Sequence, residues 1–510
     1  MTIEQYNKLD KCHFNFLLDQ HCQEEVIDAH HLLGPARFDL YAILLYIDQY
    51  VHGVQDISYA KSVYKERTCA ITGFSFSEDG NPQKNSFEEY LKSLNSLIDA
   101  FQQDEYDESK KLIPVDKKYE LIDGAHRVSC AAYFGKKIRV LKFMDVDLIP
   151  MDAPTLMNNL LPVWAADAMA LEASRWHKDL FMLFLWPKSF IDLDVHNEAR
   201  DLIHSKLEVM YEKETEMSYQ AIRNLMLQIY GHMDWVGTVD NNFISTYAKA
   251  DEVWEPQGKC RFILAQGPST EYVLSLKGEI RSLFNIGLAS IHSTDNQRET
   301  LIATNAVFNP HSFHFLKIAQ PTKYKNSYKL FEKFKNLIES KGLDKNEFVI
   351  DSSMVLSICG VREADDLDYY VSSKLSGVAS VLNGNEKIEE HDEHQKQFYS
   401  CPVDDLIYDV SNYFVYNEIK FVSLERLLEF KKKRYSLYHD AKDSSDIKLI
   451  SLLLSGKKRK LQKLVLACSV YIRRKHRRFT SSFCIFRNKI LKSIGLYDKL
   501  KQIRDFILKK

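Results

Sequence analysis

Two acidic residues separated by one residue, Asp366 and Asp368, lie near the end of the segment FVIDSSMVLSICGVREADDLDYYV. The segment around them predicts a β-strand, and alternate residues of a strand point to the same face. Two carboxylates on one face can share Mg²⁺ ions, which neutralise the charge that develops on a phosphate and polarise the attacking oxygen. The pair therefore predicts a phosphoryl or nucleotidyl transferase, or a protein descended from one. The alternative is a pair of acids that merely decorates the solvent-facing end of a strand.

The elements around this pair are predicted from their residue patterns. A helix over 352–359 places Gly360 and Arg362 in a turn just before the acidic strand, and the segment CPVDDLIYDV predicts a second strand. A short strand and a lysine-rich helix should follow, and then a helix that begins with the K-D-x-x-D pattern at Lys442.

This series resembles the minimal nucleotidyltransferases of the polymerase-β superfamily over about 110 residues. The resemblance implies Mg²⁺ or Mn²⁺ and a nucleoside triphosphate such as ATP or CTP as cofactors. Where the family has a Gly-Gly or Gly-Ser pair whose backbone amides hold the triphosphate, this chain has two serines, which lack the freedom of glycine. The resemblance implies Asp366 and Asp368 as metal ligands, Asp405 as the third carboxylate with Asp409 in reserve, and Ser352, Ser353, Gly360, Arg362, Lys431 and Lys442 as nucleotide-binding residues.

A second candidate site is the sequence D-G-A-H-R at Asp123–Arg127, which lies between a predicted strand and a predicted helix. Gly124 permits a tight turn, Arg127 can bind a phosphate through two hydrogen bonds, and His126 can position or relay a proton. Asp123 is a candidate metal ligand or base. The plain alternative is a glycine turn that carries a surface histidine and arginine.

The stretch IPV…ELIDGAHRVSCAAYFGKKIRV resembles the ParB/sulfiredoxin fold over about 70 residues. It is closer to the kinase branch that phosphorylates free serine, whose loop reads D-G-x-H-R. Ala125 stands where sulfiredoxins have their reactive cysteine, and no helix-turn-helix reader follows as in ParB proteins. The resemblance therefore implies nucleotide binding or phosphoryl transfer.

The histidines of the middle region offer a weaker site. His292 and Asp295 lie in IHSTD, and His311 and His314 lie in NPHSFHFL. They could form a shared site, but histidines at strand ends are more often structural. Thr294 or Asp295 is expected to cap the helix that follows.

Composition and charge indicate the setting. Nine cysteines are scattered singly without a C-x-x-C pair, which favours a reducing cytoplasm, and there is no signal-peptide pattern or run of eighteen apolar residues. The net charge of −2 divides into about +16 for 457–510 and about −18 for the remainder. This basic tail predicts an amphipathic helix that binds the anionic inner face of a membrane, packs on the protein body or, less favourably, binds nucleic acid.

The fold class expected is multidomain α/β (α+β). Residues 1–150 should hold a helical lead-in and the ParB/sulfiredoxin-like domain, 151–325 a middle α/β domain, 326–455 the nucleotidyltransferase-like domain, and 456–510 the basic tail. Within these, 1–70 is expected to be largely helical and 195–230 to be one long charged helix.

The function expected is a Mg²⁺-dependent phosphoryl or nucleotidyl transferase. Its acceptor would be a phosphorylated small molecule or sugar intermediate, in a pathway such as surface polysaccharide assembly, at the cytoplasmic face of a membrane. The alternatives are a defence or toxin-type nucleotidyltransferase that modifies RNA or protein, and a non-catalytic nucleotide-binding scaffold.

Overall fold

The computed structural model places most of the first 455 residues. By its contacts the chain divides into two compact units, Met1–Leu454 and Ser455–Lys510. The basic tail predicted for 457–510 lies outside the described residues. The described residues are 1–9, 17, 20–77, 84–107, 111–148, 150–256, 258–375, 382 and 387–455.

The first sheet has the strand order β1-β3-β2, with β1 antiparallel and β2 parallel to the central β3. The apolar helix α2 is buried along almost its whole length, as its sequence predicts. The expectation of a largely helical start is wrong for β1, a polar edge strand whose partner β3 lies more than 100 residues later. The elements of this part are α1 (Ile3–Asn7), β1 (Cys22–Asp28), α2 (Leu40–Val51), α3 (Ser58–Thr72), α4 (Phe87–Gln102), β2 (Ile113–Val115), α5 (Ala125–Tyr133) and β3 (Lys137–Phe143).

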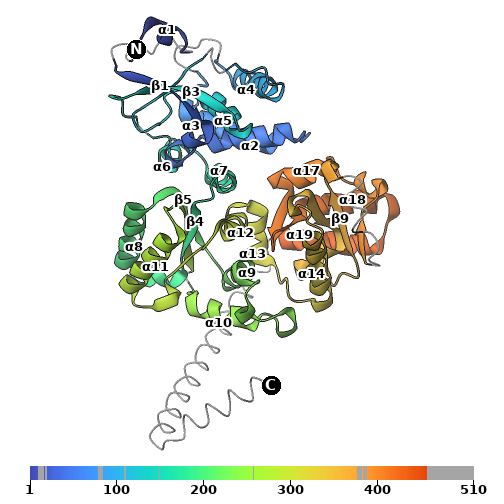
Figure 1. The fold of residues 1–510 in the computed structure, drawn as a ribbon. Helices are drawn as coiled ribbons and strands as arrows, with labels where there is room; N and C mark the ends of the chain where they lie inside the picture. Colours follow the sequence, from blue (N-terminus) through green and yellow to red (C-terminus); the bar gives the residue numbers. More distant parts are fainter. Residues whose placement is uncertain are drawn as a thin grey trace, which may run out of the picture. The chain divides into compact units, whose positions relative to one another are not determined.

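The second sheet is antiparallel throughout and has the order β5-β6-β4-β7. Helices α8 and α11 lie together on one side of it and α9 and α12 on the other (Figure 1). Its elements are α6 (Ala153–Asn158), α7 (Val163–Trp176), β4 (Leu180–Leu185), α8 (Leu193–Lys206), β5 (Glu208–Glu216), α9 (Tyr219–Tyr230), α10 (Ile244–Val253), β6 (Lys259–Gln266), α11 (Thr270–Phe284), β7 (Ile291–Ser293), α12 (Gln297–Phe308) and α13 (Pro310–Ile318).

The expected long helix over 195–230 is wrong, because the chain forms α8, β5 and α9 there. Strand β5 is rich in glutamates, and its charges are matched by neighbours: Glu214 lies opposite Arg261 on β6 and pairs with it at 2.8 Å. A charged strand stabilised by such cross-strand pairs has no apolar alternation and looks helical in the sequence.

The third sheet is mixed and has the order β10-β9-β8-β12-β11. The helix predicted after β8 is confirmed as α15. The predicted acidic strand is confirmed as β9, which includes Asp368, whereas Asp366 immediately precedes it. The strand predicted in CPVDDLIYDV is wrong: it is the helix α17, which Pro402 precedes at the N-cap. The elements are α14 (Lys325–Ser340), β8 (Phe348–Asp351), α15 (Ser352–Ile358), β9 (Leu367–Val371), β10 (Ile388–Glu390), α16 (Glu393–Lys396), α17 (Val403–Tyr408), β11 (Tyr413–Tyr416), β12 (Ile419–Val422), α18 (Leu424–Tyr438) and α19 (Ala441–Ser455).

Across the described ranges, no helix is both long and apolar enough to cross a membrane. The chain there is a mixed α/β structure with three small sheets.

A buried ionic cluster at the start of α2 should contribute strongly to stability. The Asp39 carboxylate is fully buried and accepts hydrogen bonds from Arg37 and Arg67; burial opposes its ionisation, but the two guanidinium groups outweigh burial and lower its pKa to about 2. Asp39→Asn leaves two buried guanidinium groups without a counter-charge, so we expect the free energy of unfolding to fall by about 3 kcal/mol in urea titrations. Asp104→Asn, which removes an exposed partner of Lys136, is the control and should leave the free energy of unfolding almost unchanged. An equal effect of both changes would contradict this role of the cluster.

Candidate functional site

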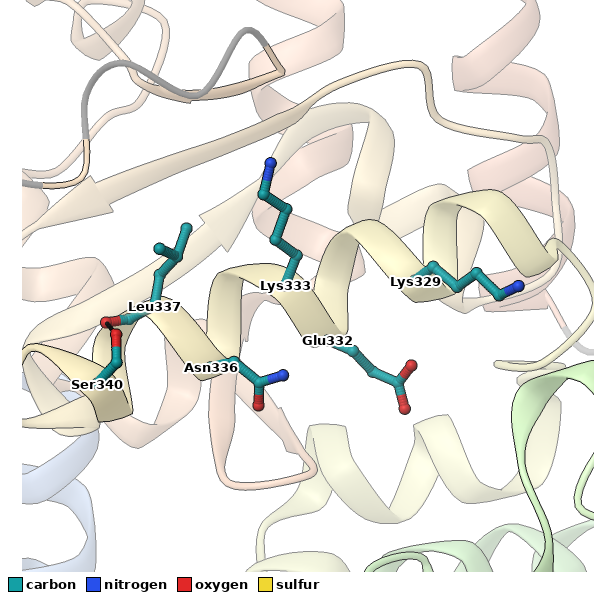
Figure 2. A pocket seen from close by; sticks show the side chains of 6 residues that line it. All are labelled: Lys329, Glu332, Lys333, Asn336, Leu337 and Ser340. Atoms are coloured by element: carbon teal, nitrogen blue, oxygen red, sulfur yellow. Dashed lines mark hydrogen bonds between the residues drawn. The ribbon is translucent and has the colours of Figure 1, made fainter.

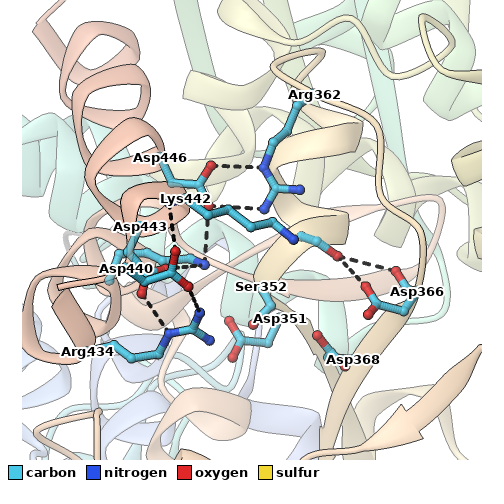
Figure 3. A network of polar contacts seen from close by, with 12 residues as sticks. Asp351, Ser352, Arg362, Asp366, Asp368, Arg434, Asp440, Lys442, Asp443 and Asp446 are labelled. Atoms are coloured by element: carbon cyan, nitrogen blue, oxygen red, sulfur yellow. Dashed lines mark hydrogen bonds and ion pairs between the residues drawn. The ribbon is translucent and has the colours of Figure 1, made fainter. Parts of the chain in front are cut away.

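The candidate site is built where β8 ends, α15 begins and β9 runs back alongside β8. In this antiparallel pair Asp351, the last residue of β8, lies directly opposite Asp368. Asp366 immediately precedes β9 and accepts a hydrogen bond from the Ser353 hydroxyl at 2.9 Å. The turn and the pairing thus bring Asp351, Asp366 and Asp368 together (Figure 3).

Ser352 has an unusual backbone conformation at this turn. Its φ is +56°, in the left-handed region that non-glycine residues rarely occupy. The serine therefore adopts the kind of conformation that glycine adopts readily, although it carries a side chain. Its hydroxyl lies 3.1 Å from the Nε2 atom of His391.

Asp351 was not among the residues singled out from the sequence. It stands at the N-cap position of α15 but makes no capping hydrogen bond. One carboxylate oxygen accepts a 2.6 Å hydrogen bond from the Tyr399 hydroxyl. The other is buried without a hydrogen-bond partner among the described residues, and it lies 3.5 Å from His391 Nε2. Its position in the sequence, directly before Ser352 and Ser353, is the feature from which Asp351 could have been predicted.

His391, which follows β10, is the second residue that the sequence did not reveal. Its Nε2 atom lies near Ser352, Asp351 and, at 3.7 Å, the Asp368 carboxylate. Its ring also lies 5.0 Å from that of Tyr370. Because one ring nitrogen serves both the serine and the aspartates, this is not the relay of a hydrolase triad, in which the two nitrogens have different partners.

The site has an excess of negative charge. Burial raises the pKa of Asp368 to about 6; the His391 imidazole opposes the rise, and the carboxylates of Asp366, Asp351 and Glu389 add to it. An unpaired buried oxygen on Asp351 and a carboxylate with a raised pKa are both features that a bound cation would relieve. The residues present therefore fit a divalent cation.

The number of protein ligands limits what kind of cation site this can be. Among the residues that the structure describes, no group of three or more His, Cys, Asp or Glu side chains is arranged to hold a metal ion. Magnesium is commonly held by one or two carboxylates, with water and substrate phosphates completing its shell. Asp366 and Asp368 fit that kind of site.

The predicted nucleotide-binding residues on the helical side divide into two groups. Arg362 forms a two-pronged ion pair with Asp446 at 2.9 and 3.0 Å, and the buried Lys431 lies between Asp443 and Asp446 at 3.0 and 3.2 Å. These pairs tie α18, α19 and the turn before β9 together. Lys442 is exposed, and its side chain extends from the start of α19 toward Asp366 (Figure 3).

Gly360 has a packing role. Its φ is +79°, and a Cβ atom there would lie 2.7 Å from the Cβ of Gln320. Only a residue without a side chain fits this contact, which fixes the turn that carries Arg362.

Asp405, the expected third carboxylate, is engaged elsewhere. It is fully buried on α17, and its two oxygens accept 2.9 Å hydrogen bonds from the backbone amides of Gln55 and Asp56. The reserve, Asp409, accepts from the Ser411 amide and from the Gln49 side chain. Both acids join α17 and the turn after it to the end of α2, because the predicted strand on which they would have faced the site is a helix.

The D-G-A-H-R loop begins α5 on the first sheet. Gly124 is the N-cap with a φ of +96°, and the Arg127 side chain is buried, with its guanidinium 3.7 Å from Asp123. The Nε2 atom of His126 lies 2.6 Å from the Tyr64 hydroxyl. The D-G-A-H-R loop and the acidic pair belong to different sheets, so the two predicted sites are built from different elements.

The histidines of the middle region do not form one site. His292 is half-buried on β7 and lies 2.9 Å from the Tyr230 hydroxyl, whereas His311 pairs with Glu425 at 3.3 Å. The cap of α12 is Asn296 and not Thr294 or Asp295. A hollow of about 490 Å³ lies along α14 and contains none of the predicted residues (Figure 2); it is lined by Lys329, Glu332, Lys333, Asn336, Leu337 and Ser340.

Comparisons with protein-family models, with curated proteins and with solved structures found no match to this chain.

The charge excess predicts a stability that depends on pH. Because the pKa of Asp368 is higher in the folded state, about 6, than its usual value of 3.8, its ionisation lowers stability as the pH rises from about 4 through 6. In EDTA, Asp368→Asn should therefore raise the free energy of unfolding at pH 7.5 by about 2 kcal/mol, with little effect at pH 4. Urea titrations at the two pH values measure this. The control is Asp365→Asn at an exposed neighbour, which should leave the free energy of unfolding unchanged at both pH values. If Asp368→Asn made the protein less stable at pH 7.5, the result would contradict an excess of negative charge in the site.

The contacts of Asp405 predict a structural role. Asp405→Ala leaves two amides without their acceptor and should lower the free energy of unfolding by about 1–3 kcal/mol. The control is Asp404→Ala, which removes two hydrogen bonds from the exposed Ser373 and should have a smaller effect. Thermal unfolding measures both, and a loss of Mg²⁺ response without loss of stability in Asp405→Ala would restore this residue to the site.

Proposed function

We propose that the site between β8, α15 and β9 binds a nucleoside triphosphate together with Mg²⁺ and transfers a phosphoryl or nucleotidyl group. The observation that supports this most is the left-handed conformation of Ser352. A strained residue persists only where its surroundings hold it, and such residues gather at functional sites. Here the strained serine stands where the family that the sequence resembles has its glycine.

The roles of the residues follow from their places. Asp366 and Asp368 hold the cation, which supplies charge neutralisation at the phosphate and polarises the attacking oxygen. The Ser353 hydroxyl donates to Asp366 and holds that carboxylate in place, while the Ser352 hydroxyl, 3.1 Å from His391, can donate to a phosphate oxygen. Lys442, exposed and extended toward Asp366, contacts the outer phosphates.

The ion pairs beside the site preserve its shape. Arg362 and Lys431 neutralise Asp446 and Asp443, so α19 stays fixed against α18 and Lys442 stays at the rim of the site. In this proposal they act as positioning residues and do not bind phosphate.

The acceptor that we propose is a phosphorylated small molecule or a sugar intermediate, as in surface polysaccharide assembly. The D-G-A-H-R loop would provide a second phosphate site on the first sheet, with Asp123 and Arg127 3.7 Å apart. The basic segment 457–510, for which the structure offers no description, would bring the enzyme to an anionic membrane surface.

A thermal-shift series with the full chain tests the proposal. We expect ATP or CTP with Mg²⁺ to raise the Tm by a few degrees over the same nucleotide in EDTA, because a ligand at 100 times its Kd stabilises the native state by about 2.7 kcal/mol. The shift, taken against each variant's own ligand-free Tm, should disappear in Asp366→Asn and Asp368→Asn. It should persist in the control Asp365→Asn.

A parallel Asp123→Asn variant separates the two candidate sites. A nucleotide shift that survives in both Asp366→Asn and Asp368→Asn but vanishes in Asp123→Asn would assign the nucleotide to the first sheet and overturn the proposal. If nucleotides bind but incubation with sugar phosphates consumes none, while RNA or protein becomes labelled by radioactive nucleotide, the acceptor class proposed here is wrong.

A further inference from the structure

The proposed function leaves an exposed aromatic pair on α16 and α18 without a role. His394 on α16 and Tyr438, the last residue of α18, are both exposed, and the Tyr438 side chain is 55% exposed. The Tyr438 hydroxyl lies 3.1 Å from the Nε2 atom of His394, and their ring centroids are 6.3 Å apart. The two rings therefore hold each other in place at the surface.

A chain of ring contacts joins this pair to the acidic site. His391, whose Nε2 lies near Ser352 and Asp368, has its ring 6.4 Å from that of Phe430. Phe430 lies 5.5 Å from Phe398, and Phe398 lies 6.1 Å from Tyr438 and 5.7 Å from His394. Phe398 and Phe430 are fully buried. Phe398 packs against the exposed pair, and Phe430 packs against His391.

The chain after this pair carries a lysine that suits the phosphates of a nucleotide. Directly after Tyr438 the chain turns at His439, in the left-handed conformation, and reaches Lys442 within one turn of α19. Along the chain, Tyr438 is four residues from Lys442, which we propose to contact the phosphates. Through the ring contacts, the pair is connected to His391, which lies beside the proposed metal ligand Asp368. Burying exposed aromatic faces against a flat ring stabilises a complex, and every nucleobase presents such a face.

We propose that His394 and Tyr438 form the stacking platform for the base of the nucleotide whose phosphates bind at Asp366, Asp368 and Lys442. This proposal rests on the proposed function, because it assigns the base of the same ligand. Stacking on a ring carries little base specificity, so the platform should accept purines and pyrimidines alike.

The experiment compares a nucleotide with a ligand that lacks a base. Isothermal titration of the full chain with ATP and with inorganic tripolyphosphate, both in Mg²⁺, should show that the wild type binds ATP more tightly. Tyr438→Ala should weaken ATP binding about tenfold or more and leave tripolyphosphate binding unchanged, since loss of one stacked base costs on the order of 1–3 kcal/mol. Tyr438→Phe keeps the ring and should retain most of the affinity.

The control is Leu437→Ala, which truncates the neighbouring side chain, 65% exposed, and should bind both ligands as the wild type does. Equal ATP affinity of Tyr438→Ala and wild type would overturn the platform while the proposed function stands. Equal weakening of ATP and tripolyphosphate would also overturn it, because the tyrosine would then act on the phosphate side. Failure of the wild type to bind either ligand would overturn the proposed function, and the platform with it.

Discussion

The antiparallel pairing of β8 with β9 is the constraint on which the candidate site depends. It sets Asp351 opposite Asp368 and, through the left-handed turn at Ser352, directs α15 so that the Ser353 hydroxyl reaches Asp366. A slip of one residue in this register would send the side chain of Asp368 to the other face of the sheet. The flanking strand residues Leu367, Tyr369 and Tyr370 are fully buried, and this burial makes such a slip costly.

The buried and half-buried acidic residues of β8, β9 and α19 fall into two groups. Asp443 and Asp446 are buried, and each is matched by lysine or arginine within 3.2 Å. Among the described residues, the ion-pair partner of Asp351 and of Asp368 is the His391 imidazole, at 3.5 and 3.7 Å, and no lysine or arginine pairs with either. Matched charges hold helices in place, whereas unmatched carboxylates cost stability and persist where they serve a ligand. Among them, the presence or absence of a lysine or arginine partner therefore distinguishes the structural carboxylates from those of the candidate site.

The aromatic residues connect these two groups. Phe430 on α18 contacts the rings of both His391 and Tyr399, and the Tyr399 hydroxyl binds Asp351. The helix whose Lys431 is locked into the ion pairs thus also supports the wall of the acidic site. A change on α18 should therefore be transmitted to the site through packing, because close-packed interiors transmit strain.

Local patterns in the sequence were sufficient for the apolar helix α2, for the helix α15 and for the strand β9, which carries Asp368. The order of serine turn, helix and acidic strand could also be predicted, since neighbouring residues determine it. Sequence reasoning failed where a partner far along the chain decides the outcome. Strand β5 depends on Arg261 of β6, and Asp405 meets amides about 350 residues away. Asp351 and His391 join the site only because β8, β9 and β10 lie side by side. The residue types near the acidic pair were thus visible in the sequence, but tertiary pairing alone decided which carboxylates stay unmatched, because a charge is neutralised by whatever folds against it.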